Sequence, residues 1–148
     1  MKIAVGSDHA GYELKERVKA YLVESGNEVR DFGAKNAESS DYPDYGGPAA
    51  MAVAEGSADR AVLVCGSGQG MCMVANRVAG VRAALAWNEK VAGLSRLHND
   101  ANVLCLPARF MEPETAIGIV DAWLKTEFEG GRHTRRVEKI MSYDTEER

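Results

Sequence analysis

A cysteine opens a glycine-rich segment near the middle of the chain. Cys65 precedes residues 66–70, which read Gly-Ser-Gly-Gln-Gly and follow an apolar run typical of a buried strand. Alternating glycines between a strand and a helix leave backbone N–H groups open to an anion or a developing oxyanion. A thiol there feels the positive end of the helix dipole, which favours the thiolate. Cys65 is therefore a candidate nucleophile or carbon-acid base. The alternative is a small buried hydrophobe, the role expected for Cys72 and Cys105.

Two named phosphate-binding motifs fit this segment poorly. A Walker A loop ends in Gly-Lys-Ser/Thr, which Gln69-Gly70-Met71 does not supply. A dinucleotide fingerprint reads G-x-G-x-x-G, but Met71 stands where its third glycine belongs, and the fingerprint usually follows the first strand. A dinucleotide-dependent enzyme is thus a weak alternative.

Polar residues also follow the first expected strand, at Asp8 and His9. A neighbouring Asp and His at the carboxyl end of a strand can bind sugar hydroxyls or an anion, or move protons. In the alternative interpretation, Asp8 caps the next helix and His9 lies on the surface.

Two further groups stand near the ends of expected helices. His98 and Asn99 come at a helix C-terminus, where a histidine is more often a partner of the helix dipole and an asparagine a turn residue. After two glycines, the segment 132–136 places three arginines and a histidine in the first turn of the last helix, against the macrodipole. A bound phosphate would turn that unfavourable charge into charge-assisted hydrogen bonds. A solvated charged face is the alternative.

Strands and helices are expected to alternate around these residues. Apolar runs predict strands at Lys2–Gly6, Glu28–Phe32, Ala61–Cys65, Val81–Ala86 and Val103–Leu106. Helical spacing and end signals predict helices at Tyr12–Ser25, Pro48–Glu55, Met71–Val78, Glu89–Leu97, Pro113–Phe128 and Arg132–Met141. This pattern indicates a single doubly wound α/β domain over residues 1–148, with a parallel sheet covered on both faces. Ligands bind such sheets outside the carboxyl ends of the strands.

Composition limits the classes of function. The chain has 148 residues, 45% hydrophobic and 27% charged, which is enough for one globular domain and excludes disorder. Its net charge of −4 and its small basic cluster argue against nucleic acid. The three histidines are far apart in sequence, and none forms a metal-binding motif, so no metal is expected.

The remaining signals concern the compartment. The three cysteines match no disulfide framework, which favours a reducing, cytoplasmic location. An expected strand begins at Lys2, which leaves no room for a signal peptide, and no uncharged run is long enough to span a bilayer. No membrane partner is expected.

Five motifs follow one another in a distinctive order, which resembles ribose-5-phosphate isomerase type B from Lys2 to about Val137. That family of sugar-phosphate isomerases also includes galactose-6-phosphate and allose-6-phosphate isomerases. The resemblance rests on Ser7-Asp8-His9-Ala10-Gly11, Asp41-Tyr42-Pro43, Cys65 with its glycine loop, Ser95-Arg96-x-His98-Asn99-Asp100 and Gly130-Gly131-Arg132-His133-x-x-Arg136.

The resemblance implies a fold and an activity. The fold is a Rossmann-like three-layer αβα sandwich with about five parallel strands and an extra C-terminal helix from about residue 132, which packs on a partner subunit. The activity is interconversion of ribose 5-phosphate and ribulose 5-phosphate in the pentose phosphate pathway, without metal or other cofactor. The assembly is a homodimer or tetramer with active sites at the subunit interface.

The resemblance also implies roles for single residues. Cys65 matches the base that moves a proton between C1 and C2 through an enediolate, and His98 matches the residue that assists opening of the furanose ring. The backbone amides of residues 66–70 match the group that holds the enediolate oxygens, and Tyr42 lines the pocket. The positions that match substrate ligands are Asp8, His9, Gly66, Ser67, Gly68, Gln69, Gly70, Asn99, Arg109, Arg132 and Arg136.

Two alternatives and one departure stay open. A hexose-6-phosphate isomerase would share the mechanism, and a non-catalytic sugar-phosphate-binding module would share the fold. Such a module would need neither Cys65 nor His98, and both are present. The helix start Met71-Cys72-Met73 is bulkier and more oxidisable than is usual in the family. Cys72 near Cys65 therefore raises the hypothesis of oxidative inactivation.

Overall fold

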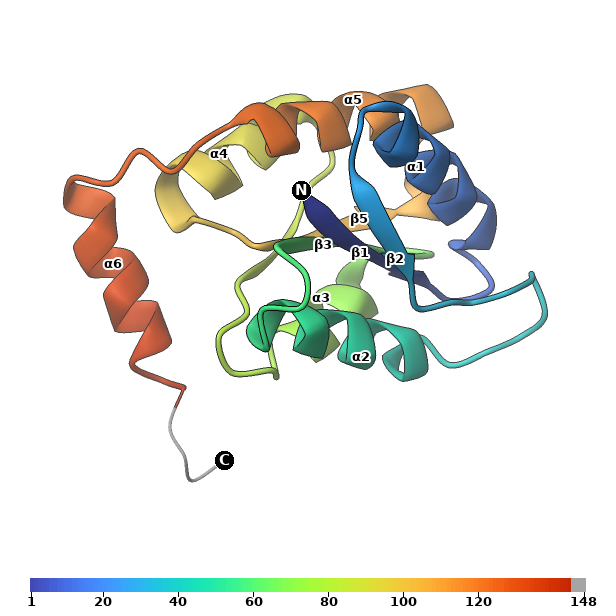
Figure 1. Cartoon of the computed structure of the whole chain (residues 1–148), viewed down its shortest axis with the longest axis horizontal. Coiled ribbons are helices and arrows are strands. Elements are labelled where there is room, and N and C mark those ends of the chain that lie inside the picture. Colours follow the sequence, from blue (N-terminus) through green and yellow to red (C-terminus); the bar gives the residue numbers. More distant parts are fainter. Residues whose placement is uncertain (145–148) are drawn as a thin grey trace.

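A five-stranded parallel sheet lies at the centre of the molecule in a computed structural model that describes residues 1–144 (Figure 1). The last four residues of the predicted domain lie outside this range. The strands are β1 (Lys2–Ser7), β2 (Glu28–Asp31), β3 (Arg60–Cys65), β4 (Ala83–Leu85) and β5 (Val103–Pro107), in the order β2-β1-β3-β5-β4. All five predicted strands are present, and β4 is shorter than predicted.

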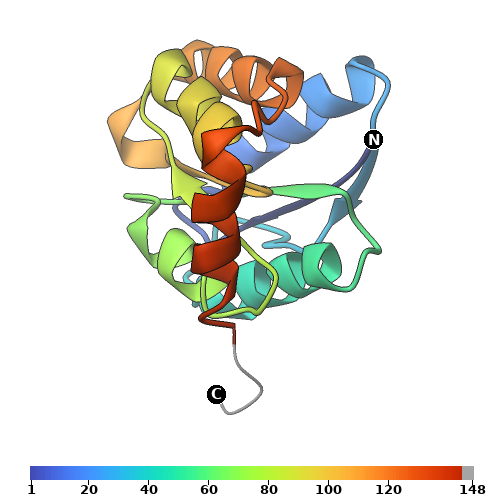
Figure 2. The same ribbon diagram turned by 90° about the vertical axis from the view of Figure 1, so that its left-hand side faces the viewer.

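Helices cover both faces of the sheet. One layer contains α1 (Tyr12–Glu24), α4 (Glu89–Asn99) and α5 (Pro113–Lys125), and the other contains α2 (Pro43–Ala54) and α3 (Gln69–Ala75) (Figure 1). A single 3₁₀ turn, η1 (Ala108–Phe110), follows β5. The last helix, α6 (Arg132–Met141), extends beside the sandwich and contacts α4 (Figures 1 and 2). The predicted three-layer αβα sandwich with an extra C-terminal helix is therefore confirmed.

The two cores follow from the alternation of side chains along the buried strands. Successive residues point to opposite faces of a sheet. Val62 and Leu104 accordingly contact the α1, α4 and α5 layer, whereas Leu63 and Cys105 contact the α2 and α3 layer.

Among the described residues, no helix is long and apolar enough to cross a membrane.

Most helix boundaries agree with the predictions to within a few residues, but the predicted start of α2 at Pro48 is wrong. The helix begins five residues earlier, at Pro43. A proline is accommodated in the first turn because the backbone N–H that it lacks would have no partner within the helix. Pro48 lies inside the helix. The helix also passes close to α3, because a Cβ on Gly46 would lie 2.5 Å from the sulfur of Met71. That contact is long-range, so the local sequence does not show it.

A buried lysine ties α1 to β2. The Lys15 side chain is 1% exposed, and its Nζ donates hydrogen bonds to Asp31 at 2.9 and 3.1 Å and to the carbonyl oxygen of Ala34. Lys19, on the exposed side of the same helix, donates to Asp31 at 3.0 Å. Burial raises the pKa of Asp31, but the hydrogen bonds from Lys15, the Gly33 amide and Lys19 outweigh it, so the pKa lies below its ordinary value.

We predict that replacing Lys15 with Met lowers the free energy of unfolding by about 3 kcal/mol, because it leaves a half-buried carboxylate and a carbonyl without their main donor. Lys19→Met is the control, since it removes an exposed partner of the same carboxylate and costs less than about 1 kcal/mol. Urea unfolding at neutral pH measures both.

The difference in the free energy of unfolding between wild type and Lys15→Met should become smaller in acid. The folded-state pKa of Asp31 is depressed, so the ion pair stabilises above its ordinary value of 3.8 and the stabilisation is lost as the pH falls through the folded-state pKa. Equal losses from the two lysine variants would contradict this account of the buried pair.

Candidate active site

A pocket of about 290 Å³ opens at the carboxyl ends of β1, β3 and β5. Each strand delivers its side chains where the chain turns toward a helix, so residues far apart in sequence meet there. The lining residues are Asp8, His9, Ala10, Tyr42, Cys65, Gly66, Ser67, Gly70, Arg109 and Phe110. A larger hollow of about 540 Å³ lies between α1 and η1, but none of the predicted site residues lines it.

Asp8 and His9 occupy this pocket in fixed orientations. One carboxylate oxygen of Asp8 accepts a hydrogen bond from the Gly11 amide at 3.1 Å, so Asp8 closes the turn into α1, as the capping interpretation predicts. Its second oxygen remains for a ligand. Ser40 holds His9 at two points: its hydroxyl accepts from the His9 amide at 3.1 Å, and its backbone contacts Nδ1 at 3.2 Å. Nε2 is then the ring nitrogen that a substrate can reach.

Cys65 and Arg109 meet where β3 and β5 end. Cys65 as a residue is 4% exposed, and it lines the pocket. The Arg109 amide donates to the carbonyl oxygen of Gly66 at 3.0 Å, which attaches η1 to the glycine loop. The Arg109 side chain lies across Gly66, where a Cβ would meet it at 3.2–3.4 Å. The guanidinium group therefore lies against Gly66 and lines the same pocket as Cys65, as a ligand for an anion would.

The other glycines of the loop are required by close contacts. Gly68 has a φ of +75°, and a Cβ there would lie 2.5 Å from Leu85 Cδ1 and 3.1 Å from the backbone of Leu106. A Cβ on Gly70 would lie 2.6 Å from the Tyr42 ring. The loop thus lies against β5 on one side and against Tyr42 on the other. This packing fixes the loop that joins Cys65 to the start of α3.

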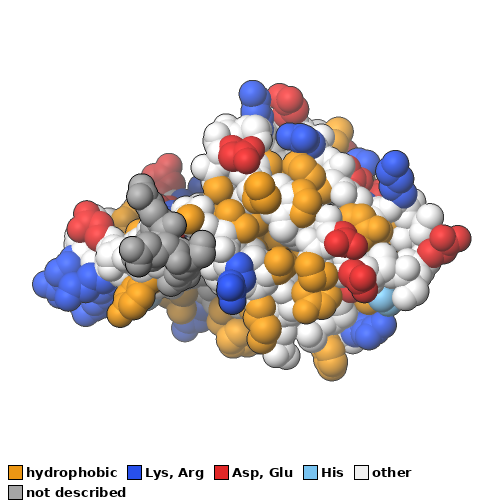
Figure 3. All heavy atoms as spheres, turned by 90° about the horizontal axis from the view of Figure 1, so that it is seen from below, with side chains coloured by type: hydrophobic (Ala, Val, Ile, Leu, Met, Phe, Trp, Pro, Cys, Tyr) orange, Lys and Arg blue, Asp and Glu red, His pale blue; other side chains and the backbone are white. Residues whose placement is uncertain are grey.

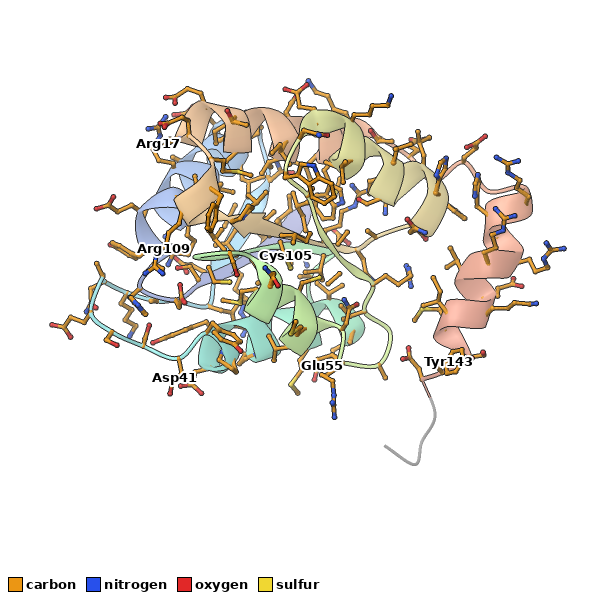
Figure 4. The ribbon with its side chains drawn as sticks, turned by 180° about the vertical axis from the view of Figure 1, so that it is seen from behind. Arg17, Asp41, Glu55, Cys105, Arg109 and Tyr143 are labelled. Carbon is orange, nitrogen blue, oxygen red and sulfur yellow. The ribbon has the colours of Figure 1, made fainter. Side chains whose placement is uncertain are left out.

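Four predicted site residues lie at the opposite edge of the sheet: His98, Asn99, Arg132 and Arg136. Helix α4 starts after β4 and returns to the amino end of β5, so its last turn, with His98, is far from the carboxyl ends. Helix α6 packs against that end of α4. Figure 4 shows Arg109 and α6 at opposite ends of the molecule. One chain therefore brings together the Cys65 half of the predicted site but not the His98 half.

His98 contacts His133, which the sequence analysis placed in the last motif but not among the site residues. Its ring stacks on that of His133, with centroids 4.3 Å apart and planes 16° apart. Burial and the adjacent His98 lower the pKa of His133, which favours a neutral ring. Glu129 completes a group of three possible metal ligands within 4.8 Å. The lone pair of an imidazole nitrogen lies in the plane of its ring, so two stacked rings do not direct their lone pairs at one ion. The group therefore fits a packing contact between α4 and α6 better than a metal site.

Some residues of the pocket half were not among the predicted site residues, including Phe110, Ser40 and Gly11. Phe110 lines the pocket from η1, and Ser40 orients His9 from a loop 31 residues away. Gly11 lets α1 start against β3, since a Cβ there would lie 2.4 Å from the carbonyl oxygen of Val64. Only Gly11, within the motif of residues 7–11, carried a local signal.

We predict that Gly68→Ala destabilises the protein by about 1–3 kcal/mol more than Gly26→Ala. Both glycines have a positive φ, of +75° and +87°, so both variants carry the cost of left-handed backbone. A Cβ on Gly26 meets nothing within 4 Å, whereas Gly68 is crowded by β5. Thermal or urea unfolding measures the difference, and equal losses would contradict the close contact.

Comparisons with known proteins agree on one family. The family model described as Ribose/Galactose Isomerase matches residues 3–140. Ribose-5-phosphate isomerase B of Escherichia coli (strain K12) is 48% identical over 143 residues, which cover 97% of this chain and 96% of that protein.

Solved structures agree as well. Ribose-5-phosphate isomerase B of Clostridium thermocellum superposes with a TM-score of 0.95 at 50% identity, covering 97% of each chain. The enzyme of the same name from Mycoplasma genitalium, with bound ribulose-5-phosphate, gives 0.94 at 45% identity, covering 98% of this chain and 97% of that one. With its pocket at the carboxyl ends of the strands and a family match along almost its whole length, this chain belongs to the ribose/galactose isomerase family of sugar-phosphate isomerases.

Proposed function

We propose that this protein interconverts ribose 5-phosphate and ribulose 5-phosphate. The observation that carries the proposal is the placement of Cys65 at the start of a glycine loop, in a pocket that also presents Asp8, His9 and Arg109. The relative from Mycoplasma genitalium, which shares the fold and 45% of its sequence, binds ribulose 5-phosphate. A pocket of about 290 Å³ is of a size suited to a small phosphosugar.

In the proposed reaction, Cys65 moves one proton. Its thiolate takes the proton from C2 of the open-chain aldose, and the C–H electron pair forms the C1–C2 double bond of an enediolate. The carbonyl π electrons move to the oxygen on C1, where the N–H groups at the start of α3 hold the negative charge. Return of the proton to C1, with transfer of the O2 proton to O1, gives the ketose. This sequence uses only groups of the chain and needs no cofactor.

A second copy of the chain would complete the site. His98 and Asn99 are the family's matches for ring opening and hydroxyl binding, and in one chain they lie across the sheet from Cys65. Arg132 and Arg136, four residues apart on exposed α6, offer a phosphate two guanidinium groups. We therefore propose a homo-oligomer in which the α4 and α6 end of one subunit covers the Cys65 pocket of its partner.

Exposed apolar side chains support such an assembly. Large hydrophobic side chains surround the pocket or lie on the α2 and α3 side, and Figure 3 shows hydrophobic groups gathered on that face. Contiguous apolar surface of this kind marks protein contacts in soluble proteins. The side chains are Tyr42 and Phe110 at the pocket, Met51 on α2 and Met73 on α3, which are 38–76% exposed. We also propose a cytoplasmic location, which the three free cysteines support.

Turnover of ribose 5-phosphate by protein treated with EDTA tests the proposed activity, with allose 6-phosphate and galactose 6-phosphate alongside. Conversion of the pentose without metal or nucleotide is the expected result. Preference for a hexose phosphate would keep the mechanism and change the substrate. Binding of these sugar phosphates without turnover of any of the three would overturn the proposed enzymatic activity and favour a sugar-phosphate-binding module.

We predict that Cys65→Ala lowers kcat by about a thousandfold while KM changes little, because a general base acts on the transition state rather than on binding. Cys105→Ala is the control: it removes a buried thiol of the same core outside the pocket and should keep most of the activity. A Cys65→Ala protein that turns over normally would remove Cys65 from the mechanism.

A mixture of two inactive variants tests the shared site. One variant is Cys65→Ala, and the other is the double variant Arg132→Ala/Arg136→Ala. We predict that equal amounts of the two, when co-expressed, regain about a quarter of wild-type activity. With random pairing, one site in four combines an intact Cys65 from one subunit with intact arginines from its partner. Arg135→Ala, an exposed arginine on the same helix, should keep its activity by itself. No recovery on mixing, with oligomers present, would mean that each site lies within one chain.

A further inference from the structure

His133 is a buried side chain to which the proposed reaction assigns no role. Helix α6 is polar and largely exposed, and its buried residues are His133 and Val137. His133 is 5% exposed. Covering an imidazole removes water from its polar nitrogens, which is unfavourable unless another contact compensates. The contact here is the ring of His98, on the last turn of α4, where α6 packs against that helix (Figure 2).

The stack restrains the ring of His98. The two rings are nearly parallel, with centroids 4.3 Å apart and planes 16° apart, as in offset-stacked aromatic pairs. Rotation of the His98 side chain about either of its torsions would break this contact. Within residues 1–144, the His98 ring makes no hydrogen bond with another protein group. The stack therefore fixes the ring and leaves its nitrogens open to a ligand.

Backbone contacts hold the start of α6 against the end of α4. The Glu129 amide donates to the carbonyl oxygen of Leu97 at 3.1 Å. The Arg96 Nε group donates to the carbonyl oxygen of Thr126 at 3.1 Å. Both bonds join the segment that precedes α6 to the last turns of α4. The two imidazoles thus meet because the fold places them together, and neither could be replaced by a residue elsewhere on these helices.

The surroundings of His133 favour a neutral ring. Burial and then the adjacent His98 lower the pKa of His133, whereas Glu129, with Oε2 3.5 Å from Nε2, opposes them. Arg132 and Arg136 lower this pKa further. A neutral His133 does not repel a proton on His98. The stack can therefore persist while His98 gives and takes a proton.

We propose that His133 is a positioning residue for His98: the stacked ring holds the His98 imidazole in the orientation that opens the furanose ring of ribose 5-phosphate. This inference rests on the proposed function. In ring opening the C1–O4 bond breaks, and its electron pair goes to O4, which takes a proton from His98. The hydroxyl on C1 gives a proton back to His98 as its O–H electron pair forms the aldehyde π bond.

The chemistry of the two sugars separates ring opening from proton transfer at carbon. Ribose 5-phosphate closes into a furanose through the hydroxyl on C4. Ribulose 5-phosphate would need the hydroxyl on C5, which carries the phosphate, so it stays open. Exchange of its C1 proton with deuterium oxide therefore needs the proposed base, Cys65, but no ring opening. Isomerisation of ribose 5-phosphate needs both steps.

The test compares these two rates by NMR in the full-length protein at saturating substrate. We expect His133→Ala to lower kcat for ribose 5-phosphate by about 10–100-fold, the cost of a misplaced group. Its C1 exchange in ribulose 5-phosphate should stay within about twofold of wild type, because the base is untouched. His133→Gln, which fills much of the space without a ring, should behave in the same way. His133→Phe keeps a flat ring against His98 and should regain most of the rate.

Val137→Ala is the matched control, because it removes the other buried side chain of α6 and leaves the stack. It should lower the stability of the protein without changing the ratio of the two rates. An unchanged ratio in His133→Ala and His133→Gln would overturn the positioning role, and so would an equal fall of the ratio in Val137→Ala.

Two further readings separate this inference from the proposed function. A wild-type protein that catalyses neither reaction would overturn the proposed function, and the positioning role with it. A wild-type protein that catalyses both, with the ratio unchanged in the His133 variants, would overturn the positioning role alone. The ring signals of His98 in the ligand-free protein test the stack directly: they should shift in His133→Ala, and unmoved signals would contradict the contact.

Discussion

All five strands run in the same direction, and the placement of every functional group depends on this. In a parallel sheet each strand-to-helix turn falls at one edge and each helix-to-strand turn at the other. Asp8, Cys65 and Arg109 lie at or just after the ends of the first, third and fifth strands and so meet in one pocket. His98 ends a returning helix and therefore lies at the opposite edge. A symmetric assembly is the simple way to bring two such edges together.

The pocket depends on close approach of backbones that only glycine permits. Gly11 lets α1 start close to the carbonyl oxygen of Val64. Gly68, with a left-handed backbone, packs against β5, and Gly70 packs against the Tyr42 ring. A side chain at any of them would push the loop away from the strand ends. Donors that are fixed before the reaction lower the barrier without the cost of reorganising during it. The rigid strand ends and the packed loop thus prepare the pocket for a developing negative charge.

Three thiols in one core have three different environments. Cys65 ends a strand at the pocket, Cys105 is fully buried in the middle of the sheet, and Cys72 lies on the helix between the two and the solvent. Reactivity follows from these positions rather than from the residue type.

The sequence by itself determined the order of the elements and the residues at strand ends. Apolar runs, helical spacing and glycine stops predicted all five strands and, with one early start at Pro43, all six helices, because these signals are local in the chain. It also identified Cys65, Asp8 and His9 as pocket residues, since the carboxyl edge of a parallel sheet collects them. Arg109 and Tyr42 came from family resemblance alone, and the structure places both in the pocket.

Only the tertiary structure decided which of these residues share a surface. The separation of His98 from Cys65, the support of His9 by Ser40 and the stacking of His98 on His133 are contacts between distant segments. A chain's local pattern sets each residue's position along an element, whereas the neighbours of that residue depend on how the elements pack.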